Sequence, residues 1–163
     1  MIWGVDYGSK MAGTTVIAAW EGGAVQLHTC AKKQDADAWL LQQTTGSPLE
    51  HIFLDAPLSL PGVYTRLPGL EDYFYREADK ELKAMSPMFL GGLTARAMRL
   101  SANLHPTPVS EVYPGAWARR WSLKSLGYKK QLRHLPAVWS VVSSHLPFSP
   151  ASPPASWHEL DAL

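Results

Sequence analysis

An antiparallel strand pattern followed by a helical crossover is the feature of the first 55 residues that most limits the possible folds. Three short segments, residues 2–6, 14–20 and 24–30, are rich in Val, Ile, Thr and Trp. Glu21-Gly22-Gly23 supplies a turn between the second and third segments. The pattern predicts three strands that form an antiparallel meander.

A helix and a fourth strand are predicted after the meander. Asp35 is a suitable N-cap for a helix that extends to about Thr44, and Thr45-Gly46-Ser47-Pro48 is suited to end it. Its apolar face holds Ala36, Trp39 and Leu40. The apolar segment 51–54 then predicts a strand. A strand reached through a helical crossover can lie parallel to an earlier one, and the first strand is its natural neighbour.

Both of these neighbouring strands lead into an aspartate, Asp6 or Asp55. Parallel strands end at one edge of a sheet, about 4.8 Å apart, so both carboxylates would face one pocket. Like charges this close raise each other's proton affinity unless a cation lies between them, which favours a divalent metal. The alternative for Asp6 is an Asx turn in which it caps its own backbone. Gly8 would let a ligand or a second strand approach closely.

Residues 58–108 are predicted to form a helical insertion after the fourth strand, punctuated by Pro-Gly and Gly-Gly pairs. Four-residue apolar spacing predicts helices over 70–83 and 93–101, the second with Arg96 and Arg99 on its opposite face. The apolar link 85–90 is expected to pack under these helices or to form a lid.

A fifth strand is predicted over residues 109–113, and Pro114-Gly115 is suited to stop it. Glu111 lies within this strand and is therefore a third acid in or near the sheet. Further helices are predicted from about Ala116 and over residues 129–143.

The last predicted element is a short C-terminal helix, reached through a proline-rich connection at residues 146–156. Ser156 is suited to be its N-cap, with Glu159 as the capping-box partner. His158 and Asp161 stand three positions apart and share one face of this helix.

The composition fits one globular domain, residues 1–163, because 46% of the residues are hydrophobic and 18% are charged. No segment approaches the roughly 20 apolar residues of a membrane span, and the N-terminus lacks a signal-peptide pattern. We therefore expect a cytoplasmic protein without membrane contact. Cys30 is the one cysteine, which excludes an intramolecular disulfide.

Charge is distributed unevenly along the chain although the net charge is only +1. Between Val112 and His158 there is no acidic residue, while this segment carries Arg119, Arg120, Lys124, Lys129, Lys130 and Arg133. Interleaved Trp117, Trp121 and Tyr128 suit a surface that follows a phosphate backbone and stacks on bases. The alternative is a solvated helix face whose tryptophans belong to the core.

The strand and helix order, with Asp at the ends of the first and fourth strands, resembles the ribonuclease-H-like fold: a five-stranded mixed sheet flanked by helices. Ile2 to Thr14 and the segment from His158 resemble the first hairpin and the final acidic helix of RuvC-type Holliday-junction resolvases. A closer resemblance is to a family of nucleases predicted from this fold and otherwise classed as a domain of unknown function. Its motifs match Gly4-Val5-Asp6-Tyr7-Gly8, Leu54-Asp55-Ala56-Pro57-Leu58, Arg76-Glu77-Ala78-Asp79 and Glu111-Val112-Tyr113-Pro114.

The resemblance implies phosphodiester cleavage with two divalent ions, Mg²⁺ or Mn²⁺, held by clustered carboxylates. Asp6 would bridge the ions, while Asp55 and Asp161 would each act as a further ligand. His158 would be a ligand or proton acceptor, and Glu111 matches the family motif without an assigned role.

Six further residues are candidates for contact with a nucleic-acid substrate. Arg76 and Asp79 belong to a family motif, and Arg76 would meet a phosphate with the help of Arg96. Lys10 follows the first motif by two positions, and Arg119 and Arg120 lie in the basic segment.

Two other functions remain open at the level of the sequence. Asp6-Tyr7-Gly8-Ser9-Lys10 also resembles the first phosphate loop of actin-like kinases and ATPases, which place nucleotide between two such domains, so this chain would need a dimer or a partner. The other alternative is a non-catalytic nucleic-acid or protein-binding module on the same fold.

Overall fold

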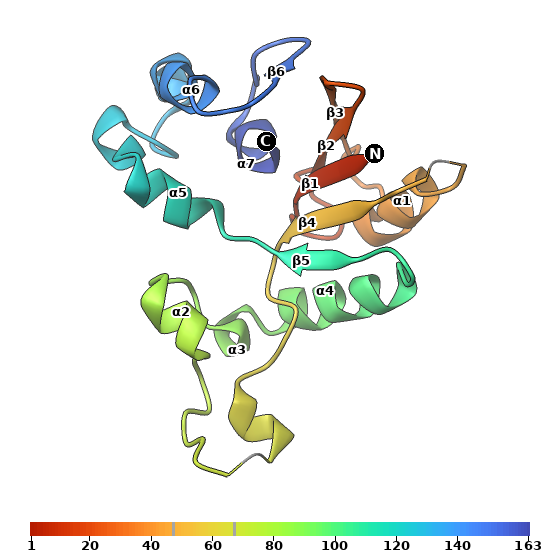
Figure 1. Cartoon of the computed structure of the whole chain (residues 1–163), viewed down its shortest axis with the longest axis vertical. Helices are drawn as coiled ribbons and strands as arrows, with labels where there is room; N and C mark the ends of the chain where they lie inside the picture. Colours follow the sequence, from red (N-terminus) through yellow and green to blue (C-terminus); the bar gives the residue numbers. More distant parts are fainter. Residues whose placement is uncertain (47, 67) are drawn as a thin grey trace.

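The protein, described by a computed structural model over residues 1–46, 48–66 and 68–163, is built on a six-stranded mixed sheet (Figure 1). The strand order is β5-β4-β1-β2-β3-β6. The strands are β1 (Ile2–Asp6), β2 (Val16–Glu21), β3 (Ala24–Thr29), β4 (His51–Asp55), β5 (Val109–Glu111) and β6 (Ser149–Pro150).

The predicted meander and crossover are confirmed. β1 pairs antiparallel with β2, and β2 with β3, whereas β4 lies parallel to β1 and β5 parallel to β4. The register of the central pair places Asp6 directly beside Asp55. Because side chains at paired positions point to the same face of a sheet, both carboxylates emerge together.

A sixth strand corrects the predicted count of five. Ser149 and Pro150 pair in parallel with Ala24 and Val25, so the proline-rich connection adds a strand beyond β3. Proline is tolerated there because an edge strand has one side free of ladder hydrogen bonds. The next residue restores the pairing, since the backbone N–H of Ala151 donates to the carbonyl of Val25 at 3.3 Å.

Seven α-helices surround the sheet within the described residues. They are α1 (Ala36–Gln43), α2 (Glu77–Glu81), α3 (Pro87–Leu90), α4 (Gly92–Asn103), α5 (Pro114–Arg120), α6 (Leu135–Ser143) and α7 (Trp157–Ala162). Three 3₁₀ turns occupy Gly62–Thr65, Leu123–Leu126 and Leu132–His134. No helix in the described ranges is long and apolar enough to cross a membrane.

The two faces of the sheet pack against different helices. The alternation of β1 and β4 buries Trp3, Val5, Ile52 and Leu54 on one face, in a core that also contains residues of α1 and α4. The helices α5, α6 and α7 lie on the other side (Figure 1), and α7 packs against β1 and β2. Asp6 and Asp55 therefore face the α7 side, because they alternate with the buried core residues.

The first helix agrees with the sequence analysis. Asp35 caps α1 by accepting hydrogen bonds from the backbone of Asp37 and Ala38, and Trp39 and Leu40 are buried. Ser47, in the segment predicted to end this helix, lies outside the described residues.

The predicted helix over residues 70–83 is wrong, because only Glu77–Glu81 forms α2. The Asp72 carboxylate accepts hydrogen bonds from the backbone N–H groups of Phe74 and Tyr75, both at 2.8 Å. Such local side-chain bonds offer the backbone an alternative to the helix. The apolar residues behind the prediction, Leu70, Phe74 and Leu82, are consequently exposed.

The rest of the insertion follows the prediction more closely. The helix expected over 93–101 is α4, with Ala97 and Leu100 buried. Four residues of the apolar link form α3, which is joined to α4 by a hydrogen bond from the Thr94 hydroxyl to the Pro87 carbonyl at 2.7 Å.

Two boundaries near the C-terminus differ from expectation. The strand predicted over residues 109–113 already ends at Glu111, and Pro114-Gly115 begins α5 instead of stopping the strand, since proline is favoured in the first turn of a helix. The helix predicted from residue 129 begins at Leu135 as α6. Lys129 has φ of 57°, a left-handed conformation that a helix excludes.

Candidate metal centre

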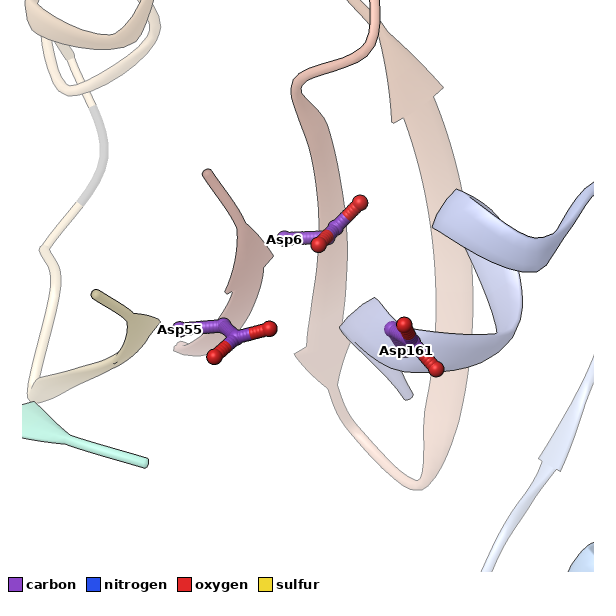
Figure 2. A group of neighbouring side chains, drawn as sticks. All are labelled: Asp6, Asp55 and Asp161. Atoms are coloured by element: carbon purple, nitrogen blue, oxygen red, sulfur yellow. The ribbon is translucent and has the colours of Figure 1, made fainter. Parts of the chain in front are cut away.

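Three aspartates from distant parts of the chain converge at the ends of β1 and β4. Asp6 ends β1, Asp55 ends β4 and Asp161 lies on α7, with their carboxylates turned toward a shared space (Figure 2). One oxygen of each carboxylate lies within 4.8 Å of the others. The structure thus brings together all three residues expected to be metal ligands.

A glycine lets α7 approach the sheet closely enough to present Asp161. A Cβ atom built on Gly4 would stand 2.0 Å from the carbonyl oxygen of Ala162, so no larger residue fits without displacing the helix. Gly8 is also tightly packed, but against Thr14 of the turn into β2. Sequence reasoning considered Gly8 and missed Gly4, although both lie in the same short motif.

The N-terminus of α7 is capped by Ser156, as predicted. The Ser156 hydroxyl accepts a hydrogen bond from the backbone N–H of Glu159 at 3.1 Å. The reciprocal half of the predicted capping box is absent, because the Glu159 carboxylate accepts from the N–H of Ala155 instead, at 2.5 Å. Since α7 has only six residues, its position depends on these contacts and on its packing over Gly4.

Burial and mutual repulsion favour the protonated forms of two of the aspartates. Burial, followed by the charges of Asp6 and Asp161, raises the pKa of Asp55 to about 7. Burial and the charge of Asp161 also raise the pKa of Asp6 to about 6, against the opposing influence of His158. A cation between the carboxylates would relieve both effects.

Asp161 is bound on both of its oxygens by one dipeptide. The Tyr128 hydroxyl donates to Oδ1 at 2.5 Å, and the Lys129 ammonium pairs with Oδ2. Burial opposes the charged form of Lys129, but Asp161, Asp6 and Asp55 together outweigh it and raise the pKa of the ammonium. Sequence reasoning placed these two residues in a general basic segment, and no local signal connected them with Asp161.

His158, expected next to Asp161 on the last helix, also lies beside Asp6. Its Nδ1 is 2.6 Å from Oδ2 of Asp6, and its side chain is about half exposed. The Asp6 carboxylate therefore contacts His158 of α7 and lies beside Asp55 of β4. This arrangement differs from the alternative of an Asx turn in which Asp6 caps its own backbone.

The remaining candidate acid, Glu111, belongs to a separate ion-pair network. Arg76 donates to both of its carboxylate oxygens at 2.6 Å and to both oxygens of Asp79 at 2.6 and 2.9 Å. Glu111 also accepts from the backbone N–H of Leu58 at 2.9 Å. Three motifs of the family resemblance thus meet here, in a network that connects the insertion to β5.

Two other predicted substrate contacts are occupied by acids of the protein. Lys10 pairs with Asp35 at 2.9 Å. Arg96 pairs with Asp37 at 2.6 Å, and the same carboxylate accepts a 2.5 Å hydrogen bond from Tyr7. The Arg96 guanidinium also lies over the Tyr7 ring. Arg96 belongs to the face of α4 opposite its apolar residues, as predicted. Both pairs have a structural role in connecting α1 with its neighbours.

The last two predicted contacts lie on α5. Cζ of Arg119 is 5.6 Å from the ring centroid of Tyr113, and its guanidinium donates to the carbonyl of Leu82 at the end of α2. Cζ of Arg120 is 5.4 Å from the ring centroid of Trp117. Both arginines therefore lie next to aromatic side chains, the combination expected of a nucleic-acid surface.

The donor set of the cluster fits a hard divalent cation. Three carboxylates supply only oxygen ligands, which suit Mg²⁺ and Mn²⁺ better than softer metals. The pKa values of Asp6 and Asp55 are raised, as expected for acids that are buried close together with too little positive charge nearby. Lys129 supplies one positive charge against the three carboxylates.

Comparisons with known proteins yield no relative. No family model matches the sequence, and neither the curated proteins nor the solved structures contain a match. The chemistry assigned to this site therefore rests on its own residues.

Proposed function

We propose that the protein is a divalent-metal-dependent hydrolase of phosphodiester bonds, a nuclease, on a ribonuclease-H-like fold. The observation that carries this proposal is the convergence of Asp6, Asp55 and Asp161 within 4.8 Å. These residues come from two adjacent parallel strands and a helix more than 100 positions away, so local chain geometry does not account for the cluster.

The topology supports the fold assignment. Three antiparallel strands, a crossover helix and two parallel strands in the order β5-β4-β1-β2-β3 are the arrangement that the sequence resemblance implies. A carboxylate at the end of each of the two central parallel strands, and another on the last helix, fit the same expectation.

The chemistry assigns a role to each residue around the cluster. When bound, divalent metal ions activate a water molecule and stabilise the leaving oxygen in phosphodiester hydrolysis. Asp6 stands between Asp55 and His158, which suits it to a shared ligand position. His158 uses Nδ1 toward Asp6, so Nε2 is the atom that would accept or return a proton. Tyr128 holds the Asp161 carboxylate in orientation.

A cleavage screen tests the proposal. Single-stranded, duplex, hybrid and branched nucleic acids are incubated with the protein and Mg²⁺ or Mn²⁺. We expect metal-dependent cleavage of at least one substrate, and loss of this activity in Asp6→Asn. Glu21→Gln is the matched control, because it also converts a carboxylate to an amide but lies exposed at the far end of β2.

Two results would contradict the assignment. Cleavage that persists in Asp6→Asn would show that another site, or a contaminant, is responsible. Binding of nucleic acid without cleavage of any substrate would instead support the non-catalytic module. Calorimetric titration with Mg²⁺ separates these cases, since the hydrolase requires metal binding that Asp6→Asn weakens.

A further inference from the structure

A large aromatic cavity lies between the sheet and the helices α5, α6 and α7. Its volume is about 500 Å³, within the range of sites for small organic molecules. The sheet contributes Trp20 and Phe53, and the helical side contributes Trp117, Trp121, His145 and Phe148. These rings share the wall with aliphatic side chains such as Val112, Leu123 and Leu160.

Three of these rings lie in a row, in which Trp121 stacks on His145 and is tilted by 33° from Trp117. The ring centroids of Trp117 and Trp121 are 5.1 Å apart, and those of Trp121 and His145 are 4.6 Å apart with an angle of 11° between the planes. Trp117 is 51% exposed although it is among the largest apolar side chains. A flat ring entering the cavity would find a partner at this exposed edge of the row.

The cavity is continuous with the carboxylate cluster. Asp161 and Tyr128 line the cavity and also belong to the candidate metal centre. Gly4 and Phe53 line it from β1 and β4, each two positions before the aspartate that ends its strand. A group in the cavity would therefore lie beside whatever binds at the three aspartates.

One arginine lies beside an aromatic side chain of the cavity wall on the helical side. Arg120 lies over the Trp117 ring, and Arg119 is on the same helix. The whole segment between Val112 and His158, which supplies most of the helical wall, carries no acid. An anionic molecule with an aromatic group matches this combination, whereas a neutral lipid chain does not use the charges.

We propose that this cavity holds an unpaired nucleobase of the strand that is cut, next to the phosphodiester at the three aspartates. The proposal rests on the proposed function and specifies its substrate class: single-stranded or locally unpaired nucleic acid, rather than a continuous duplex. A base inside a duplex is stacked and paired, so it reaches such a cavity only after leaving the helix. Stacking on aromatic side chains accepts any base, because every base has a π-face.

Base binding is tested without cleavage. The probe is a single-stranded hexanucleotide with phosphorothioate linkages and one 2-aminopurine, titrated with the full-length protein in Mg²⁺. We expect quenching of the 2-aminopurine fluorescence on binding, and an affinity about tenfold weaker in Trp117→Ala, equivalent to about 1.4 kcal/mol. A competitor with an abasic position in place of the 2-aminopurine should also bind about tenfold more weakly.

Two variants control for general effects. Trp117→Phe keeps a flat ring and should restore most of the affinity, which distinguishes stacking from a loss of folding. Phe89→Ala removes an aromatic side chain that is 64% exposed on α3 and does not line the cavity, so it should leave the affinity unchanged. Equal effects of Trp117→Ala and Phe89→Ala would overturn the proposal.

The outcomes separate this proposal from the proposed function. Metal-dependent cleavage that is unaffected by Trp117→Ala and by an abasic position would overturn the base site and leave the hydrolase intact. Quenching that depends on Trp117, without cleavage of any substrate, would support the base site and contradict the hydrolase. Absence of binding by either probe, or binding of an apolar dye that the hexanucleotide does not displace, would overturn the base site.

Discussion

At the scale of single residues, Asp161 shows how the protein holds a buried carboxylate in place. Its side chain is 2% exposed, yet both oxygens have partners, Tyr128 and Lys129. A buried charge with such partners keeps a fixed orientation, which a metal ligand needs. Lys129 adopts its left-handed backbone conformation, unusual for a residue other than glycine, at this contact.

Removal of the Tyr128 hydroxyl should weaken metal binding more than it weakens the fold. In Tyr128→Phe the ring still packs against Trp157, while Asp161 loses the donor at Oδ1. We expect a loss of Mg²⁺ affinity of about tenfold to a hundredfold by calorimetry, the usual effect of residues that orient metal ligands. Tyr64→Phe, on an exposed ring of the insertion, is the matched control. Unchanged affinity in Tyr128→Phe would refute the orienting role.

The stability of the metal-free protein should fall as the pH rises from about 4 to about 7. In this window the folded protein keeps protons on Asp6 and Asp55, with pKa values of about 6 and 7, that the unfolded chain has released. Raised folded pKa values therefore favour folding at low pH, and this contribution is lost through pH 7 at up to roughly 1.4 kcal/mol per pH unit for each group.

Chemical denaturation between pH 4.5 and 8 measures this dependence. Asp55→Asn should flatten the curve, because an amide does not titrate. Mg²⁺ should stabilise the wild type more at pH 8 than at pH 5.5, since protons compete for the same oxygens. A stability curve that rises through this window in both proteins would contradict the assignment.

At the scale of secondary-structure elements, the contact between β1 and α7 determines whether the site exists. Gly4 faces Ala162 across this contact and lies two positions before Asp6, on the same face of the strand. The helix that carries Asp161 and His158 thus rests on the strand that carries Asp6.

Gly4→Ala should disturb the site although it changes no ligand. The added methyl group collides with the backbone carbonyl of Ala162, which is less able to move than a flexible side chain. Either α7 therefore shifts, or the free energy of unfolding falls by about 1–3 kcal/mol. Mg²⁺ titration and urea unfolding measure the two effects. Gly92→Ala at the start of α4 is the control, because nothing lies within 4 Å of the added atom. Equal behaviour of the two variants would show that α7 adapts without cost.

Sequence patterns predicted the elements whose determinants are local. The strand alternation, the Gly-Gly turn and the Asp35 cap involve neighbouring residues, and the parallel crossover then places Asp6 beside Asp55. The prediction of a helix over residues 70–83 was wrong, because the apolar spacing does not show that Asp72 forms a local turn with the backbone of Phe74 and Tyr75. The contacts of Tyr128 and Lys129 with Asp161 were not predictable, because they depend on the packing of the segment around Tyr128 against α7, which is distant in sequence. Asp161 itself was suggested by family resemblance and not by its local pattern.

At the scale of the whole molecule, the Arg76 network connects the insertion to the sheet. Asp79 is 2% exposed and depends on Arg76, which also binds Glu111 of β5. Burial of both partners makes this network more important for the fold than exposed pairs such as that of Lys80 with Asp72. The sequence analysis placed Arg76 at the substrate because a motif shows which residues matter without showing their partners.

Arg76→Met should destabilise the protein by about 3–5 kcal/mol, because it leaves Asp79 buried and unpaired. Urea unfolding measures the change, and limited proteolysis should show faster cleavage within residues 58–108. The double variant Arg76→Met with Asp79→Leu should recover much of the loss, since no unpaired charge remains. If Arg76→Met changes only the affinity for nucleic acid, with the stability retained, the substrate role is correct instead.

The pairing of Asp6 with His158 across 152 positions has a consequence for the order of assembly. During synthesis the N-terminal part of a chain emerges first, and contacts between distant positions form late. The strands β1 to β4 would therefore leave the ribosome with Asp6 and Asp55 side by side and α7 still to be made. The proposed metal affinity would then arise only after α7 has been made, because a chain that stops before α7 holds Asp6 and Asp55 but lacks Asp161.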